Sequence, residues 1–274
     1  MLRSMYSGVS GMRGFQTKLD VIGNNIANVN TVGFKTGRVM FKDIMSQTIS
    51  GVTTPEEGTV GGVNARQIGL GTSIGSIDTI HTGGSAMTTN NPLDLRIDGD
   101  GFFLVKLSDD QEVPFLTRAG NFQVDALGQL VTADGLLVCN NAGDVLEPIV
   151  DGDVTAFSIS ADGTITTKLT DGTTATVGPI GLAKVTNPAG LEKIGGNLYR
   201  VTTNAIADGE IDAGYTTPNT NGAGALVVGE LEMSNVELTS EFTEMIVAQR
   251  GFQANSRIIT TSDEVLQEVV NLKR

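Results

Sequence analysis

Two amphipathic stripes, one at each end of the 274-residue chain, constrain its fold more than any other feature. In the first thirty residues, apolar side chains recur at steps of three and four with one gap. This spacing predicts a helix over residues 2–27. The positions that we assign to a helix–helix contact in this stripe are Leu2, Met5, Val9, Met12, Leu19, Ile22 and Ile26.

The last forty residues carry a longer stripe, in which the steps alternate between four and three. This heptad spacing predicts a coiled-coil helix over residues 235–272, about 55 Å long at 1.5 Å per residue. Ser234 and Asn235 are expected to cap its N-terminus. The contact positions that we assign to this helix are Leu238, Phe242, Met245, Gln249, Phe252, Ile259, Leu266 and Val270.

The middle of the chain changes to runs of five or six residues that are broken by Asp-Gly pairs. Asp-Gly is typical of the tight type I′ turns of antiparallel hairpins, and the high glycine content, 35 of 274 residues, fits many turns. Residues 50–75 are rich in Gly, Thr, Ser and Pro and indicate an extended linker or irregular arm. We expect strands over 102–107, 114–117, 129–132, 136–139, 156–160, 164–168 and 180–185.

These patterns predict a mixed, mainly β fold whose domains are discontinuous in sequence. The helices within 1–34 and 231–274 would pair as one coiled-coil domain. Residues 35–76 would form an extended arm or linker, and 77–230 an inserted antiparallel β domain. The ends carry opposite charge, +5 over 1–42 and −3 over 231–274, which favours their association. Exposed ion pairs contribute only ~0.2–1 kcal/mol each, so the apolar stripes must dominate.

Composition narrows the possible functions. A net charge of −13 and a pI near 4.4 argue against contact with nucleic acid. The single cysteine excludes an intramolecular disulfide and any cysteine-based metal cluster. The single histidine makes a zinc site or Ser/His catalysis improbable. The sequence contains no run of ~18 apolar residues, so it predicts no membrane span. The first residues lack the continuous apolar core of a signal peptide. We therefore expect neither membrane insertion nor a conventional secretion signal.

Three features could carry chemistry, and each has a simpler explanation. The glycine-rich segment 69–75 lacks both the spacing and the Lys-Ser/Thr of a phosphate-binding loop. Asp94, Asp98 and Asp100 lack EF-hand spacing and are typical of a turn. His81 has no nucleophile motif around it and is expected to be structural. By elimination, the chain is predicted to be an interaction protein, not an enzyme, with no metal and no cofactor.

The terminal stripes have two possible explanations. The helices could form the core of a single globule, which is the usual outcome for short amphipathic helices. A stripe of about 38 residues, on a chain whose ends bracket a separate β block, instead favours helices that pack against other copies of the chain. The pattern alone favours the second explanation.

Three groups of residues resemble the signatures of bacterial flagellar axial proteins, the rod and hook subunits. Near the N-terminus they are SGM at 10–12 and LDVIGNNIANVNTVGFK at 19–35. Near the C-terminus they are LEMSNVEL at 231–238 and MIVAQRGFQAN at 245–255. In the middle they are IDGDGFF, TRAGNF and GQLVT, which begin at positions 97, 117 and 128. The resemblance covers nearly the whole chain.

The resemblance implies a structural subunit that is exported through the flagellar type III apparatus without a cleaved signal peptide and polymerises into a tubular, helical assembly. Its partners would be other copies of itself, neighbouring rod, hook-cap and hook–filament junction proteins, and the export apparatus. Its place would be the basal body and hook, at the cell exterior. Carried over to this sequence, the bend between the first helix and the arm would be formed by Asn28, Thr31, Gly33, Phe34 and Lys35.

Finer resemblances bear on the choice between hook and rod. The length suits a distal rod subunit or a short hook protein, because many hook proteins have an additional outer domain. NPLDL at 91–95, MIVAQR at 245–250 and VNLKR at 270–274 look more like hook sequences. The resemblance therefore favours the hook, a flexible joint that transmits torque from rod to filament, over the distal rod. Two alternatives come from other classes: a secreted adhesion module on a coiled-coil stalk, and a hydrolase using His81 or the acidic turn near Asp98.

Overall fold

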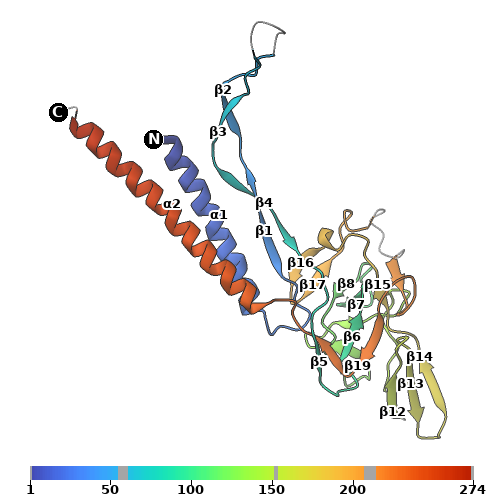
Figure 1. Cartoon of the computed structure of the whole chain (residues 1–274). Coiled ribbons are helices and arrows are strands. Elements are labelled where there is room, and N and C mark those ends of the chain that lie inside the picture. Colours follow the sequence, from blue (N-terminus) through green and yellow to red (C-terminus); the bar gives the residue numbers. More distant parts are fainter. Residues whose placement is uncertain (1, 55–60, 151–153, 207–213, 273–274) are drawn as a thin grey trace. The chain divides into compact units, whose positions relative to one another are not determined.

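The chain folds into two compact units, and the computed structural model describes residues 2–54, 61–150, 154–206 and 214–272 of it. The helical unit consists of Met1–Ala27, Gly37–Thr79 and Glu237–Arg274, and the β unit of Asn28–Thr36 and Ile80–Val236. The predicted fold class, mainly β with terminal helices and an inserted antiparallel β domain, is confirmed (Figure 1).

Two long helices belong to the helical unit, α1 (Leu2–Ala27) and α2 (Leu238–Leu272). Both coincide with the predicted helices, except that α2 begins three residues later than expected. The expected N-cap is wrong. The Asn235 amide bonds to the main-chain N–H of Thr36 (2.8 Å) and the carbonyl of Ile80 (2.9 Å), so it is already engaged by other segments. Ser234 Oγ accepts from the N–H of Val236, before the helix begins.

The arm of the helical unit is a two-stranded β-ribbon, not the irregular segment that composition suggested. Strand β1 (Gly37–Asp43) pairs antiparallel with β4 (Thr72–Thr79), and β2 (Ser46–Ser50) pairs with β3 (Arg66–Gly69). Most of its side chains are exposed on both faces. A ribbon without one buried face has no reason to alternate apolar and polar residues, so the period-2 signal is missing.

The β unit contains antiparallel strands only, among the residues that the structure describes. The largest sheet follows the order β16-β17-β8-β7-β11-β10-β9, with β15 pairing β7 and β18. A three-stranded sheet, β12-β13-β14, and the pairs β19-β6 and β20-β5 complete it. The strands are β5 (Ala86–Thr88), β6 (Leu95–Asp98), β7 (Phe102–Lys106), β8 (Phe115–Thr117), β9 (Phe122–Val124), β10 (Leu130–Thr132), β11 (Leu137–Val138), β12 (Val154–Ile159), β13 (Ile165–Leu169), β14 (Thr174–Val177), β15 (Leu182–Ala183), β16 (Glu192–Gly195), β17 (Leu198–Arg200), β18 (Tyr215–Thr216), β19 (Ala225–Val228) and β20 (Glu230–Glu232).

Strand β7 is buried along its whole length and contributes to two hydrophobic clusters. Phe103 and Val105 belong to one cluster, and Phe102 and Leu104 to the other. This division follows from the strand geometry, because successive side chains point to opposite faces. The ring of Phe103 packs edge-on against Phe122, with 5.1 Å between the ring centroids. Each of the seven expected strands overlaps an observed one, β7 among them.

The hairpin turns differ from the type I′ turns that the Asp-Gly pairs predict. Type I′ needs positive φ at both central residues. Only the glycine of each pair has it, and the preceding aspartate does not, at Asp134, Asp162 and Asp171. Between β13 and β14, Gly172 N–H donates to the Leu169 carbonyl, which leaves a three-residue loop closed by one left-handed glycine. The pairs at 151 and 208 lie outside the described residues.

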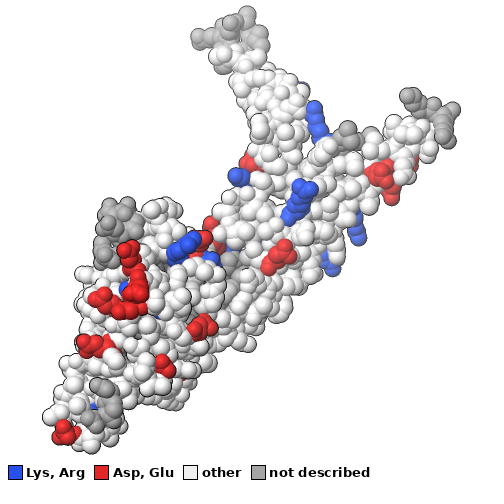
Figure 2. Space-filling model, turned by 180° about the vertical axis from the view of Figure 1, so that it is seen from behind, with Lys and Arg blue, Asp and Glu red and all other residues white. Residues whose placement is uncertain are grey.

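Nearly all of the net negative charge resides on the β unit. Its sequence holds 20 acidic and 8 basic residues, a net charge of −12, whereas the helical unit holds 11 acidic and 10 basic residues. On the face shown in Figure 2, acidic side chains predominate among the charged groups of the β unit. Two such units repel each other unless specific contacts offset the repulsion.

Candidate subunit interface

Helices α1 and α2 pack side by side in opposite directions (Figure 1). Ser4 and Ser262 hydroxyls lie 3.5 Å apart near one end, and the Asn25 amide donates to Glu241 (3.2 Å) near the other. An ion pair of 2.8 Å joins Lys18 to Glu244. The two helices therefore form one antiparallel hairpin within the helical unit.

Small residues make the close contacts of this hairpin. A Cβ placed on Gly8 would lie 3.4 Å from Ile259, and one on Gly11 would lie 2.7 Å from the Asn255 amide. On α2, a Cβ at Gly251 would lie 2.6 Å from the ring of Phe15. The face of α2 toward α1 thus includes small and polar residues beside Ile259, and Ala248 is the only buried residue in the described part of the helix.

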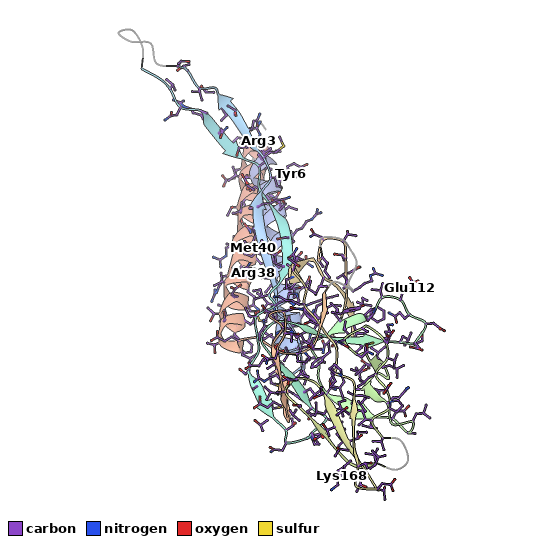
Figure 3. All side chains as sticks on the ribbon, turned by 90° about the vertical axis from the view of Figure 1, so that its right-hand side faces the viewer. Arg3, Tyr6, Arg38, Met40, Glu112 and Lys168 are labelled. Atoms are coloured by element: carbon purple, nitrogen blue, oxygen red, sulfur yellow. The ribbon has the colours of Figure 1, made fainter. Side chains whose placement is uncertain are left out.

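This seam leaves large apolar side chains uncovered. Of the 27 exposed large hydrophobic residues in the described chain, 21 belong to the helical unit, which holds fewer than half of all residues. On α2 they include Phe242, Ile246 and Val247, and on the arm Met40 and Met45. Figure 3 labels Tyr6 on α1 and Met40 on β1, both exposed. Apolar surface on this scale is typical of a protein–protein contact.

A groove of about 580 Å³ lies between α1 and the arm in the same unit. Val9 of α1 and Leu70 and Ile74 of the arm supply part of its apolar lining, and Arg13 part of its polar lining. In the same unit the ring of Phe15 on α1 packs against the ring of Phe41 on the arm, with 5.7 Å between the ring centroids. The unit therefore offers both an apolar ridge, on α2, and an apolar groove.

The structure places the predicted interface residues at different depths. Ile22 is buried, and the side chain of Leu2 lies outside the described residues. Half-buried residues are Met5, Val9, Met12, Leu19, Ile26, Met245, Ile259 and Leu266. Exposed residues are Leu238, Phe242, Gln249, Phe252 and Val270. Their role in contacts between subunits stays a prediction.

The residues assigned to the helix-to-arm bend pack within the β unit. After α1 ends at Ala27, the hydroxyl of Thr31 donates to Asn28 Oδ1 (3.1 Å). Gly33 has φ +70°, and a Cβ there would lie 2.7 Å from the Ala119 nitrogen, so only glycine fits. Lys193 Nζ lies 4.9 Å from the centre of the Phe34 ring, a cation–π contact.

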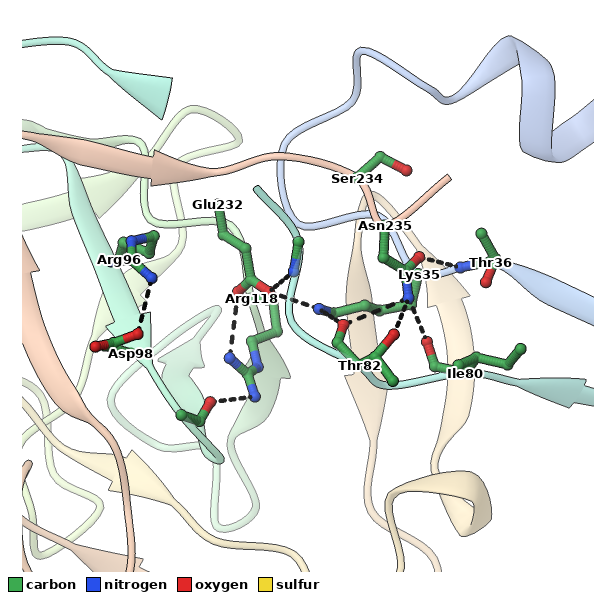
Figure 4. Close-up of polar contacts among 12 residues, drawn as sticks. Lys35, Thr36, Ile80, Thr82, Arg96, Asp98, Arg118, Glu232, Ser234 and Asn235 are labelled. Carbon is green, nitrogen blue, oxygen red and sulfur yellow. Dashed lines mark hydrogen bonds and ion pairs between the residues drawn. The ribbon is translucent and has the colours of Figure 1, made fainter. Parts of the chain in front are cut away.

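Lys35, the last residue of this motif, anchors a buried charge cluster (Figure 4). Its Nζ contacts Glu232 Oε1 at 2.6 Å and donates to the Thr82 carbonyl at 2.7 Å. Arg118 Nη1 donates to the other oxygen of Glu232 (3.2 Å), and its Nη2 to the carbonyl of Gly99 (2.9 Å). Lys35, Arg118 and Glu232 come from the three separate sequence motifs, so the fold joins all three motifs at one point.

Burial and charge act in opposite directions on this cluster. Burial lowers the pKa of Lys35 below its ordinary value, and Glu232 offsets part of that effect. Burial alone would raise the pKa of Glu232, but Arg118 and Lys35 together hold it below its ordinary value. The cluster thus brings two basic groups, Lys35 and Arg118, to the single carboxylate of Glu232.

Two asparagines tie the chain near its crossings between the units. In the β unit, Asn235 bonds to Thr36, Ile80 and the Thr82 hydroxyl (3.0 Å). In the helical unit, Asn25 makes two hydrogen bonds to the main chain of Gly37, at 2.9 and 3.0 Å. An amide suits this task because it donates and accepts at once.

Sequence reasoning missed the partners in these contacts. Glu232, Arg118, Asn25 and Asn235 all lie within the quoted motifs, yet periodicity assigns them no role. The available signal was a single basic residue in each of the N-terminal and middle motifs, Lys35 and Arg118, and an acidic residue, Glu232, in the C-terminal motif. The glycines at 8, 11 and 14 of α1, spaced by three, were a second signal for a close helix contact.

The other candidate sites have structural partners. His81 packs against the rings of Phe102 and Tyr199, with centroids 5.7 and 5.5 Å away. Asp98 pairs with Arg96 at 3.1 Å. Within the described residues, no three His, Cys, Asp or Glu side chains come together as a metal site. Neither described helix is long and apolar enough to cross a bilayer.

Three family models match this chain. The one described as Flagella basal body rod protein covers residues 5–35. The one described as Flagellar hook protein FlgE/F/G D1 domain covers 96–167. The one described as Flagellar basal body rod FlgEFG protein C-terminal covers 227–272. The matched regions contain Lys35, Arg118 and Glu232 respectively.

Similar proteins divide into full-length and partial matches. The chain is 56% identical over 274 residues to the flagellar basal-body rod protein FlgG of Bacillus subtilis, with 100% of both chains covered. It is 38% identical over 276 residues to the rod protein FlgG of Borreliella burgdorferi, again with both chains covered. Its 54% identity to the flagellar hook protein FlgE of Treponema pallidum spans 139 residues, 50% of this chain and 29% of the hook protein.

Proposed function

The chain belongs to the family of flagellar basal-body rod and hook proteins, structural proteins of the flagellar axis, and within this family we propose that it is a subunit of the distal rod. The observation that carries the proposal is the end-to-end match to a rod protein. The rod protein of Bacillus subtilis and this chain cover each other completely, and no segment of either is left over.

The hook, which the sequence resemblance favours, has less support from the comparisons than the rod. The hook resemblance is high where it exists, at 54% identity, but it covers half of this chain and 29% of the hook protein. The short segments that favour the hook, such as NPLDL and MIVAQR, span only a few residues of the chain. The distal rod is therefore the better assignment, and the hook becomes the second candidate.

The helical unit supports a polymerising subunit. Its exposed apolar side chains, on α2 and the arm, need a cover that the single chain does not provide. Repeated head-to-tail contacts that do not close generate a helical filament. We propose that neighbouring copies supply this cover and that other rod and hook proteins adjoin the ends of the polymer. Export through the flagellar type III apparatus and residence in the basal body follow from the same proposal.

Electron microscopy of basal bodies tests rod against hook. In a strain of the source bacterium that lacks this chain, we expect a shortened rod and no hook, and we expect the wild-type gene to restore both. A full-length rod that ends without a hook would instead identify the chain as a hook subunit. Intact basal bodies with hooks would remove it from the axis altogether. A strain carrying a truncated chain without residues 243–274 tests the role of the helix. That chain lacks most of α2, so we expect it not to polymerise and not to restore the rod.

A further inference from the structure

A cavity of about 610 Å³ opens beside the buried charge cluster of the β unit. Arg118 of the cluster lines it, together with His81, Lys184, Asp100 and the ring of Phe102. Its volume lies in the range of small-molecule and side-chain pockets. Nothing in the rod assignment gives this cavity a role.

The cavity borders an excess of buried positive charge. Lys35 and Arg118 share the single carboxylate of Glu232, and all three side chains are at most 4% exposed. Lys184 and Asp100 also line the cavity, and within the described cluster the two basic groups exceed the one carboxylate by one. A buried charge without a counterion is costly, and a carboxylate in the cavity would remove that cost.

Two hydrogen-bonding atoms at the cavity lack partners in the described part of the chain. They are Arg118 Nε and His81 Nδ1, which are buried within side chains that line the cavity, so a ligand reaches them only when those side chains rotate. Arg118 Nε always carries a hydrogen and can only donate. Burial, with the positive charges of Lys35, Lys193 and Arg118, lowers the pKa of His81 to about 4, so the ring is neutral at neutral pH and can also donate from Nδ1.

We propose that this cavity binds a carboxylate, and that the ligand is an acidic side chain of a second copy of the chain. The inference rests on the proposed polymer. Each β unit carries 20 acidic residues and a net charge of −12, so adjacent copies repel. An acidic side chain inserted into a positive cavity turns one of these repulsive groups into a specific contact that fixes how two copies meet.

Charge reversal at Lys184 tests the occupant in the full chain. Lys184 is exposed and its side chain donates to the Asn221 carbonyl (2.8 Å), so we expect Lys184→Glu to keep the fold. We expect it to raise the concentration needed for assembly about tenfold, whereas Lys184→Arg assembles normally. Lys168→Glu is the matched control, because it makes the same charge change on an exposed residue of β13 outside the cavity lining (Figure 3).

His81 provides a direct probe, because it is the only histidine. With histidine-labelled full-length monomer, we expect sodium acetate, but not sodium chloride at equal ionic strength, to shift the imidazole NMR signals saturably. We also expect these signals to be shifted in the assembled polymer. The shift should be lost in Lys184→Glu and kept in Lys168→Glu.

The outcomes separate this inference from the proposed function. If acetate binds but Lys184→Glu assembles like wild type, the ligand is a free carboxylate and the second-copy occupant is wrong. If acetate leaves the His81 signals unchanged, the carboxylate pocket itself is wrong. If the wild-type chain never assembles, the proposed rod function and the second-copy occupant both fail, and the acetate titration still decides the chemistry of the cavity.

Discussion

Glu232 is the residue on which the β unit depends most for its internal charge balance. It accepts from Lys35 and Arg118 through its side chain, and its main-chain carbonyl accepts from Gly33 (2.8 Å). Replacement by Gln keeps the shape but leaves two buried cations without a carboxylate. Removing one partner of a buried ion pair typically costs ~3–5 kcal/mol. We expect Glu232→Gln to lower the free energy of unfolding of the β unit by that amount in urea denaturation.

Glu230 offers a matched control two residues away. Its carboxylate pairs with Arg96 at 2.9 Å, but both groups are partly exposed to solvent. Glu230→Gln should therefore cost ~1 kcal/mol or less. Equal losses for the two variants would show that Glu232 is effectively solvated and that the cluster is not a structural centre.

The same cluster gives the β unit a dependence on acid. The pKa of Glu232 is lower in the folded chain than the ordinary value of ~4.3 in the unfolded chain. Its contribution to stability is therefore complete above that ordinary value and is lost as the pH falls through the lower, folded value. In Glu232→Gln this part of the acid sensitivity disappears.

This cluster could not be read from the sequence. The three charged residues are separated by 83 and 114 positions, and each stands inside a different motif. Periodicity reports which face a residue occupies within its own element, not which distant residue it meets. By contrast, Gly33 was assigned to the bend that follows the first helix, and its φ of +70° is one that glycine adopts readily.

The α1–α2 hairpin shows how close contact between elements depends on glycine. A Cβ on Gly251 would lie 2.6 Å from the ring of Phe15, whereas a Cβ on Gly23 of α1 would meet no atom within 4 Å. Alanine favours a helix over glycine by ~0.8–1 kcal/mol, and overpacking costs ~1–3 kcal/mol. We therefore expect Gly23→Ala to raise the thermal stability of the helices and Gly251→Ala to lower it.

Circular dichroism at the helix band, recorded against temperature, measures both variants. The pair is matched, since each change is Gly to Ala in the interior of a long helix. A stabilised Gly251→Ala chain would mean that the two helices do not approach each other at that point, and the antiparallel hairpin would have to be revised.

At the element scale, the sequence predicted the helices well and the ribbon poorly. Helices α1 and α2 have one covered side and a spacing of three and four, which the pattern records. On α2, Gly8 of α1 approaches Ile259, which the periodicity selected, and Gly11 approaches Asn255, which it did not select. The arm carries no one-sided burial, so nothing in its pattern marks the strands β1 to β4.

The chain as a whole separates two kinds of surface. The β unit has its own buried core and an acidic exterior. The helical unit holds most of the large apolar side chains that are exposed in the described chain. The first unit is complete as a single copy, while the second has hydrophobic surface left for partners. Under the proposed function, the acidic β unit would oppose non-specific association and the apolar surface of the helical unit would be the part that neighbouring copies cover.

The exposed apolar face of α2 allows a direct test of whether neighbouring copies cover the helical unit. Phe242 and Ile246 lie one helical turn apart on α2 and are 49% and 59% exposed. Serine has a helix propensity close to that of both residues, so the double variant Phe242→Ser, Ile246→Ser should leave the melting temperature of the monomer nearly unchanged. If neighbours cover these side chains, each loses ~1.5–3 kcal/mol of burial, and the concentration needed for assembly should rise at least ~tenfold.

Leu127→Ser is the control for this variant. Leu127 is 72% exposed, but it lies on a turn of the self-contained β unit, so we expect normal assembly and an unchanged melting temperature. Sedimentation of polymer against total protein measures the first property, and calorimetry of the dilute monomer the second. A large drop in the melting temperature of the double variant would assign Phe242 and Ile246 to the core of the single chain. Assembly at the wild-type concentration would show that this face of α2 stays in water, and the apolar surface that supports polymerisation would then have to lie on the arm.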